Sequence, residues 1–205
     1  MRADWVLFLL LTTVACSASD QARPNATSVS APFESRVPTS ETPPTGSELV
    51  LESPAFANGD AIPSEFTADG ANASPPLSWN RAPQGTRSFA VLCIDPDAPR
   101  GEFTHWVLWN IAAGARKVDS SLRQEHFLGV AGTNDFGRVG WGGPQPPLGH
   151  GPHRYVFRLF ALDVRELPLA EGATRSDLEG AMAGHIVAIA ETVGVYERGQ
   201  PELSR

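Results

Sequence analysis

Cysteine is scarce in this chain of 205 residues, which contains only Cys16 and Cys93. Two cysteines cannot form the disulfide framework that holds many small secreted domains together. Cys93 lies in the apolar run FAVLCID, where we expect a small buried side chain. The folded part of the chain must therefore rely on a hydrophobic core.

Positive charge is also in short supply, since 16 Lys and Arg face 23 Asp and Glu, for a formal net charge of -7. Broad nucleic-acid binding needs a basic face, so this balance argues against a nucleic-acid partner. It leaves room for a small site, basic or lined by histidines, that binds an anion.

Common catalytic motifs are absent, because the sequence contains neither an HExxH pair nor a G-x-S-x-G nucleophile elbow. Simple repeats are absent as well. We therefore predict a protein that is not an enzyme and uses no cofactor. The alternative is a weak hydrolase or metal-dependent enzyme built from scattered His and Asp residues.

Residues 1–16 resemble a targeting segment. Their apolar run WVLFLLLTTVA is shorter than the ~20 residues of a spanning helix but fits a secretory signal. Small residues before Cys16 resemble a bacterial lipobox, so we expect cleavage there and a lipid anchor on Cys16 in the cell envelope. The alternative is ordinary signal cleavage that releases a soluble periplasmic or extracellular protein.

The next segment, residues 17–46, is rich in Ser, Thr and Pro and has few large apolar side chains. Such a composition cannot bury enough surface to fold, so we expect a disordered tether. The folded domain is predicted over residues 47–200, with a short tail at 201–205.

Strands dominate the predicted domain. The runs RSFAVLCID, HWVLWNIAA and RYVFRLFAL are apolar on both faces, which is typical of central strands in a sheet covered on both sides. The stretch ELVLESPAF predicts a further strand at the start. Turn signals separate these runs, so the pattern favours a mainly β domain of sandwich type.

One helix is predicted near the C-terminus. Ser176 and Glu179 form a possible capping box at its start. Apolar residues then recur at helical spacing at Leu178, Met182, Ile186, Ile189 and Val193.

The stretch CIDPDAPRG places Asp95 and Asp97 where a buried strand ends. If the strand continued, both carboxylates would share a side with Cys93. They could act as acid and base, as metal ligands, or as anchors for neighbouring donors. The alternative is a turn in which the Asp side chains accept backbone N–H bonds.

Histidines open the two other central strands. His105 begins one of them and is expected to share a face with Val107, Trp109 and Ile111, either at a pocket rim or as a core residue. In GHGPHRYVF, His153 and Tyr155 share a face about 7 Å apart. Arg154 is expected to point away, into a salt bridge. His150 lies in the preceding Gly- and Pro-rich run and is a weaker candidate.

Two long motifs, DPDAPRGEFTHWVLWNI and GGPQPPLGHGPHRYVFRLFAL, resemble the signature regions of the phosphatidylethanolamine-binding protein (PEBP) family. The similarity is greatest to its bacterial, Raf-kinase-inhibitor-like branch, which SPPLSW and GHIVAIAETVGVYER also resemble. It covers roughly residues 49 to 198. It implies a β-sandwich with a large central antiparallel sheet, a smaller sheet and peripheral helices.

The resemblance also implies a small pocket for phosphate-like anions or phospholipid head groups. Its expected lining is Asp95, Asp97, Pro99, His105, Pro146, Pro147, His153 and Tyr155. We expect an Asp to orient a histidine ring and favour its charged form, which then receives the anion. A protein-interaction role, such as inhibition of a kinase or peptidase, stays open as an alternative.

Overall fold

The computed structural model describes residues 48–80, 82–121 and 129–199. The expected signal segment with Cys16, the tether and the C-terminal tail lie outside these residues. Within them, no helix is both long enough and apolar enough to cross a membrane.

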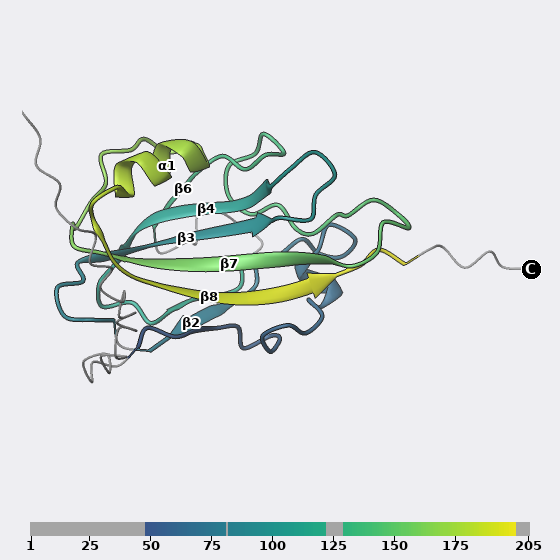
Figure 1. Ribbon diagram of the computed structural model, residues 1–205, viewed down its shortest axis with the longest axis horizontal. Helices are drawn as coiled ribbons and strands as arrows, with labels where there is room; N and C mark the ends of the chain where they lie inside the picture. Colours follow the sequence, from purple (N-terminus) through teal and green to yellow (C-terminus); the bar gives the residue numbers. More distant parts are fainter. Residues whose placement is uncertain (1–47, 81, 122–128, 200–205) are drawn as a thin grey trace, which may run out of the picture. The chain divides into compact units, whose positions relative to one another are not determined.

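A large antiparallel sheet forms the centre of the described domain (Figure 1). Its strands run in the order β6-β4-β3-β7-β8. Two pairs of neighbours in the sheet, β3-β4 and β7-β8, are also consecutive strands in the chain. Their bounds are β6 Val130–Ala131, β4 Phe103–Ala112, β3 Ser88–Asp95, β7 His153–Leu162 and β8 Ile186–Tyr196. The three strands predicted from long apolar runs are β3, β4 and β7, and they occupy the middle of this sheet.

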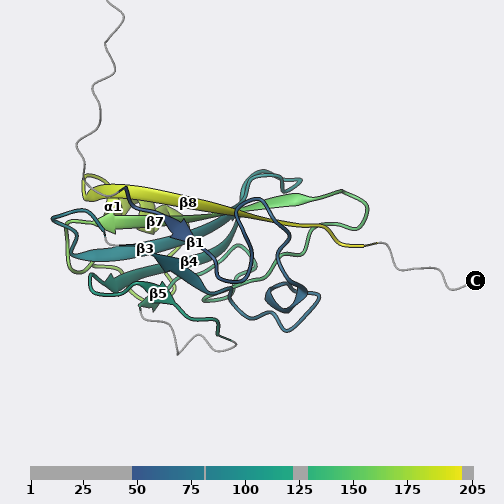
Figure 2. The ribbon, with the colours of Figure 1, turned by 90° about the horizontal axis from the view of Figure 1, so that it is seen from below.

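A small antiparallel sheet has the order β1-β2-β5 and lies close to the large one (Figure 2). Its strands are β1 Leu51–Glu52, β2 Leu77–Trp79 and β5 Lys117–Val118, and a 3-10 turn, η1, spans Ser64–Phe66. The first strand is therefore much shorter than the stretch ELVLESPAF predicts.

Both faces of the large sheet are covered by apolar side chains, as the continuous apolar runs predict. One face packs on the small sheet in a core that includes Leu77, Phe89 and Phe157. The other packs Leu92 and Val107 against the helix α1, Arg175–Met182. The two cores, one on each face of the large sheet, confirm the predicted mainly β sandwich with a large sheet, a smaller sheet and a C-terminal helix.

The helix is shorter than the sequence predicts. Thr174 caps it and forms a capping box with Asp177, and Leu178 and Met182 are its buried residues. The helical assignment beyond them is wrong, because Ile186–Tyr196 is strand β8. Gly184, at φ 82°, follows the helix end, and β8 is rich in β-branched residues that pair with β7 along its length.

Candidate functional site

A pocket of about 270 Å³ opens where β3 ends and β4 and β7 begin. These three strands are antiparallel neighbours, so their ends meet at one edge of the sheet. All the residues predicted to contact a ligand, except Asp97, line this pocket: Asp95, Pro99, His105, Pro146, Pro147, His153 and Tyr155.

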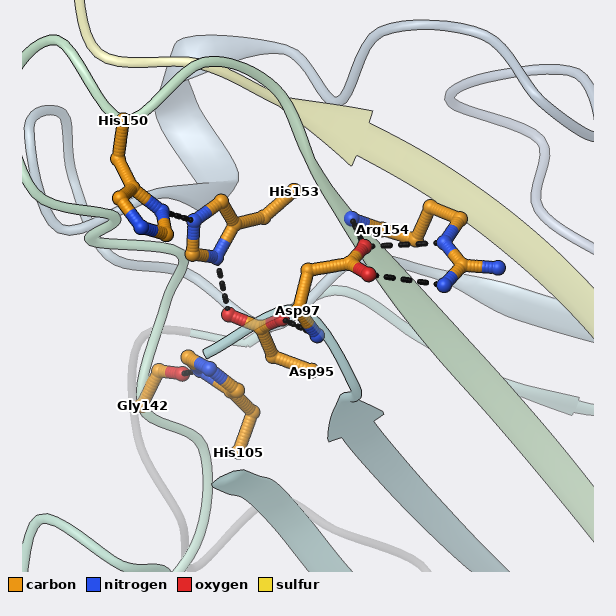
Figure 3. Close-up of polar contacts among 7 residues, drawn as sticks. All are labelled: Asp95, Asp97, His105, Gly142, His150, His153 and Arg154. Carbon is orange, nitrogen blue, oxygen red and sulfur yellow. Dashed lines mark hydrogen bonds and ion pairs between the residues drawn. The ribbon is translucent and has the colours of Figure 1, made fainter. Parts of the chain in front are cut away.

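Three side chains form a hydrogen-bonded row beside the pocket (Figure 3). The Asp95 carboxylate Oδ2 lies 2.7 Å from His153 Nδ1, as expected for an Asp that orients a histidine. The other ring nitrogen, His153 Nε2, lies 2.7 Å from His150 Nδ1. Asp95 and His153 are buried, whereas His150 is exposed. Because a carboxylate only accepts, His153 Nδ1 is the donor in the bond to Asp95.

Tyr155 presents a buried hydroxyl that has no hydrogen-bond partner among the described residues. It follows His153 by two positions on β7, and both side chains are buried on the same face, as the alternation predicts. Burial raises the pKa of the Tyr155 hydroxyl, and the negative charge of Asp95 raises it further. The group therefore stays protonated and can donate a hydrogen bond to a ligand.

His105 reaches the pocket because of a β-bulge. Cys93 pairs with Trp106 and Ile94 pairs with Thr104, so His105 is an extra residue in β4 with no partner in β3. A second irregularity surrounds Asn110, whose φ is 57°. The predicted common face for His105 with Val107 and Trp109 is therefore wrong, since an inserted residue reverses the alternation that follows it. The predicted sharing with Ile111 is confirmed, because the second irregularity returns Ile111 to the core that holds Tyr155, a ring partner of His105.

The buried His105 ring is held in a defined state. Its Nδ1 donates to the carbonyl oxygen of Gly142 at 2.5 Å, and its ring meets the Tyr155 ring edge-on at 5.0 Å. Burial lowers the pKa of His105 despite the bond to Gly142, which acts in the opposite direction. His105 is thus neutral near pH 7, and the charge expected of a pocket histidine is not carried by this ring.

Asp97 points away from the pocket. Its carboxylate accepts bonds from Arg154 Nε, Arg154 Nη2 and the Arg154 backbone N–H at 2.8–2.9 Å (Figure 3). The hydrogen bond from the Arg154 side chain lowers the pKa of Asp97 to about 2. The predicted outward salt bridge of Arg154 is confirmed, and the chain turns after Asp95, whose Oδ1 accepts the Asp97 N–H at 2.8 Å.

The proline-rich segment 141–147, which forms the rim of the pocket, is fixed to a neighbouring loop. Trp141 Nε1 donates to the Phe66 carbonyl, the Gly143 N–H donates to Asn72 Oδ1, and the Ala68 N–H donates to the Pro144 carbonyl. In the rim sequence PQPP, Gln145 carries the only backbone N–H, because proline has none. The rim can thus present one amide donor from a rigid backbone.

The far wall of the pocket is aromatic. Phe103 and Phe136 line it, with ring centroids 4.7 Å apart in an edge-on contact. Neither phenylalanine was singled out by the sequence, although Phe103 lies in the same motif as His105. Phe136 comes from a loop that only tertiary contacts bring to the site, where the Asp135 N–H donates to the Thr104 carbonyl.

Two side chains of opposite charge lie at the mouth of the pocket. Arg100 and Glu102 both line it, but Glu102 is paired with Arg175 at 2.8 Å. Arg100 forms no ion pair with any residue that the structure describes. Over the same part of the chain, no three His, Cys, Asp or Glu side chains gather closely enough to hold one metal ion.

The fold and this site define a class, namely antiparallel β-sandwich proteins with a small histidine-lined pocket at one end of the large sheet. A family model described as phosphatidylethanolamine-binding protein matches residues 52–197. The chain belongs to this family.

Relatives share most of the folded domain. A UPF0098 protein of Aquifex aeolicus is 46% identical over 155 residues, covering 75% of this chain and 91% of that protein. Among solved structures, Escherichia coli YbcL, described as a member of the mammalian PEBP family, matches with a TM-score of 0.70 and 32% identity. That match covers 74% of this chain and 99% of YbcL. A PEBP homolog from Chlamydia trachomatis matches with a TM-score of 0.68 and 36% identity, and the match covers 74% of this chain and 98% of that protein.

Proposed function

We propose that this protein is a non-catalytic binding protein whose pocket takes a phosphate-bearing small molecule or the phosphate of a phospholipid head group. The observation that carries the proposal is the Tyr155 hydroxyl, which is buried on the pocket wall without a hydrogen-bond partner. An unpaired buried polar group costs stability, so its retention on a pocket wall suggests a ligand that completes it.

The surrounding charges support an anionic ligand. The Asp95 carboxylate accepts a hydrogen bond from His153, and the Glu102 carboxylate forms an ion pair with Arg175. Arg100 at the mouth lacks such a partner among the described residues and is available to attract negative charge. A phosphate oxygen can accept hydrogen bonds from the Tyr155 hydroxyl and from a histidine ring. Because the phosphate is charged, these bonds are stronger than hydrogen bonds between neutral groups.

The aromatic wall supports a ligand that is more than a bare anion. Phe103 and Phe136 offer apolar surface next to the polar end of the pocket. A phosphate ester with an attached organic group would place its two parts against these two surfaces. The family's description as phosphatidylethanolamine-binding agrees with this chemistry.

Calorimetry with inorganic phosphate and with phosphoethanolamine tests the proposal. His153→Ala should weaken binding about ten- to a hundredfold, which corresponds to a lost charge-assisted hydrogen bond of about 1.5–3 kcal/mol. Because that variant leaves Asp95 buried without its partner, His153→Asn is the second variant. An Asn amide can replace the Nδ1 donor to Asp95 while removing Nε2.

Arg154→Ala is the matched control, because the Arg154 side chain points outward to Asp97. It should bind both probes like the parent protein. Unchanged affinity in both His153 variants, or equal losses in all three variants, would contradict the proposed site. A parent protein and variants that bind neither probe would contradict the proposed function itself.

A further inference from the structure

Both ring nitrogens of His153 are already engaged in this structure. Nδ1 faces Asp95 and Nε2 faces His150, each at 2.7 Å (Figure 3). His153 is 1% exposed, so the orientation of its ring is set by these two partners and the strand that carries it. It therefore has no free ring nitrogen to offer a ligand.

An imidazole nitrogen makes one hydrogen bond, in the plane of its ring. A ligand oxygen that accepts from His153 Nε2 must lie about 2.7–2.9 Å from that nitrogen, as charge-assisted bonds do. His150 Nδ1 occupies this position now. A ligand can thus bond to His153 only after one of its two partners leaves.

The structure indicates which partner leaves. Asp95 is 3% exposed, sits at the end of β3 and also accepts the Asp97 N–H. His150 is exposed and lies between Gly149 and Gly151, whose φ values are 75° and 84°. Apart from its ring contact with His153, its one hydrogen bond to a residue that the structure describes is from its N–H to the Pro147 carbonyl at 3.1 Å.

We infer that His150 is a displaceable cap on His153, an internal competitor that sets the affinity of the pocket for its ligand. The inference rests on the proposed function, because it concerns the same site. The flanking glycines allow the backbone to change conformation at low steric cost, so the ring can swing into solvent while His153 stays in place. Every ligand that bonds to Nε2 must first break the bond between the two histidines.

The consequence is a variant that binds more tightly than the parent. A net hydrogen bond of about 0.5–1.5 kcal/mol corresponds to an affinity change of about two- to tenfold. His150→Ala removes the competitor, so its affinity for inorganic phosphate should rise by that factor. His150→Asn keeps a polar group close to the position of Nδ1 and should stay near the parent value.

Calorimetric titration of the full chain with inorganic phosphate tests whether His150 is such a cap. His185→Ala serves as the control for removing an exposed histidine, since His185 is held by Asp163 on another part of the domain. Its affinity should equal that of the parent. Tighter binding by His150→Ala alone supports the cap, as does phosphate binding by this variant when the parent shows none.

Three outcomes would overturn the inference. Weaker binding by His150→Ala would make His150 a direct ligand residue, and unchanged binding would mean that the ligand does not use His153 Nε2. Either result leaves the proposed function intact if the parent binds phosphate. If neither the parent nor His150→Ala binds, both the cap and the proposed function fail.

Discussion

Tyr155→Phe should make the protein more stable and a weaker binder at the same time. The substitution removes only the hydroxyl, which is buried and unpartnered among the described residues. Leaving such a group unsatisfied costs about 1–3 kcal/mol, so its removal should stabilise the folded state by an amount in that range. The phenyl ring keeps its packing against His105.

The magnitude is large enough to measure. For a domain of this size, the melting temperature should rise by about 2–4 °C for each kcal/mol gained. Affinity for inorganic phosphate should fall about ten- to a hundredfold, because a hydrogen bond to a charged acceptor of about 1.5–3 kcal/mol is lost. Thermal unfolding without ligand and calorimetry with phosphate measure the two effects separately.

The chain supplies a matched control, because Tyr196 is its second and last tyrosine. Its hydroxyl donates to Asp69 Oδ2 at 2.9 Å, so Tyr196→Phe should leave the melting temperature unchanged or lower it, with no effect on phosphate binding. A lower melting temperature for Tyr155→Phe, with unchanged affinity, would contradict this prediction. It would give the hydroxyl a structural partner instead of a ligand.

Three further predictions address the rest of the chain. Asp97→Asn should cost at most about 1 kcal/mol near neutral pH, because the Arg154 side chain is exposed and the Asp97 carboxylate is partly exposed to solvent. The folded pKa of Asp97, about 2, lies below the unfolded value, so this contribution is fully present above about pH 4 and is lost as the pH falls through 2. A melting-temperature difference between parent and variant that is as large at pH 2 as at neutral pH would contradict it. Gly194→Ala should destabilise the domain by about 1–3 kcal/mol, since a Cβ there would lie 2.4 Å from Ile62 and 2.9 Å from Phe56; in urea unfolding, Gly180→Ala on α1, where nothing lies within 4 Å, is the control and should not lose stability. Mass spectrometry of the mature protein should find diacylglycerol on Cys16, and an unlipidated product that starts beyond this residue would exclude the anchor.

Much of the fold could be predicted from local patterns. Long apolar runs identify β3, β4 and β7 as strands covered on both faces, because a strand alternates its side chains and both sets are apolar here. The same alternation places His153 and Tyr155 on one face and Arg154 on the other. Proline and glycine before β7 likewise indicate a rim, since they set backbone angles that end regular structure.

Other features depend on partners distant in the sequence. Apolar residues from Ile186 onward fit a helical period, yet the open edge of β7 pairs with them and makes β8. The bulge that turns His105 toward the pocket arises from its register with β3, which no local pattern records.

The candidate site likewise combines features that local sequence predicts with features that depend on distant parts of the chain. Local patterns indicate which residue types gather at the ends of three strands, and most of those residues do line the pocket. Contacts formed in the folded domain turn Asp97 outward to Arg154, keep His105 neutral and place His150 over His153. The physical reason is that alternation is a local property of the backbone. Burial and hydrogen-bond partners are set by segments that meet only when the chain has folded.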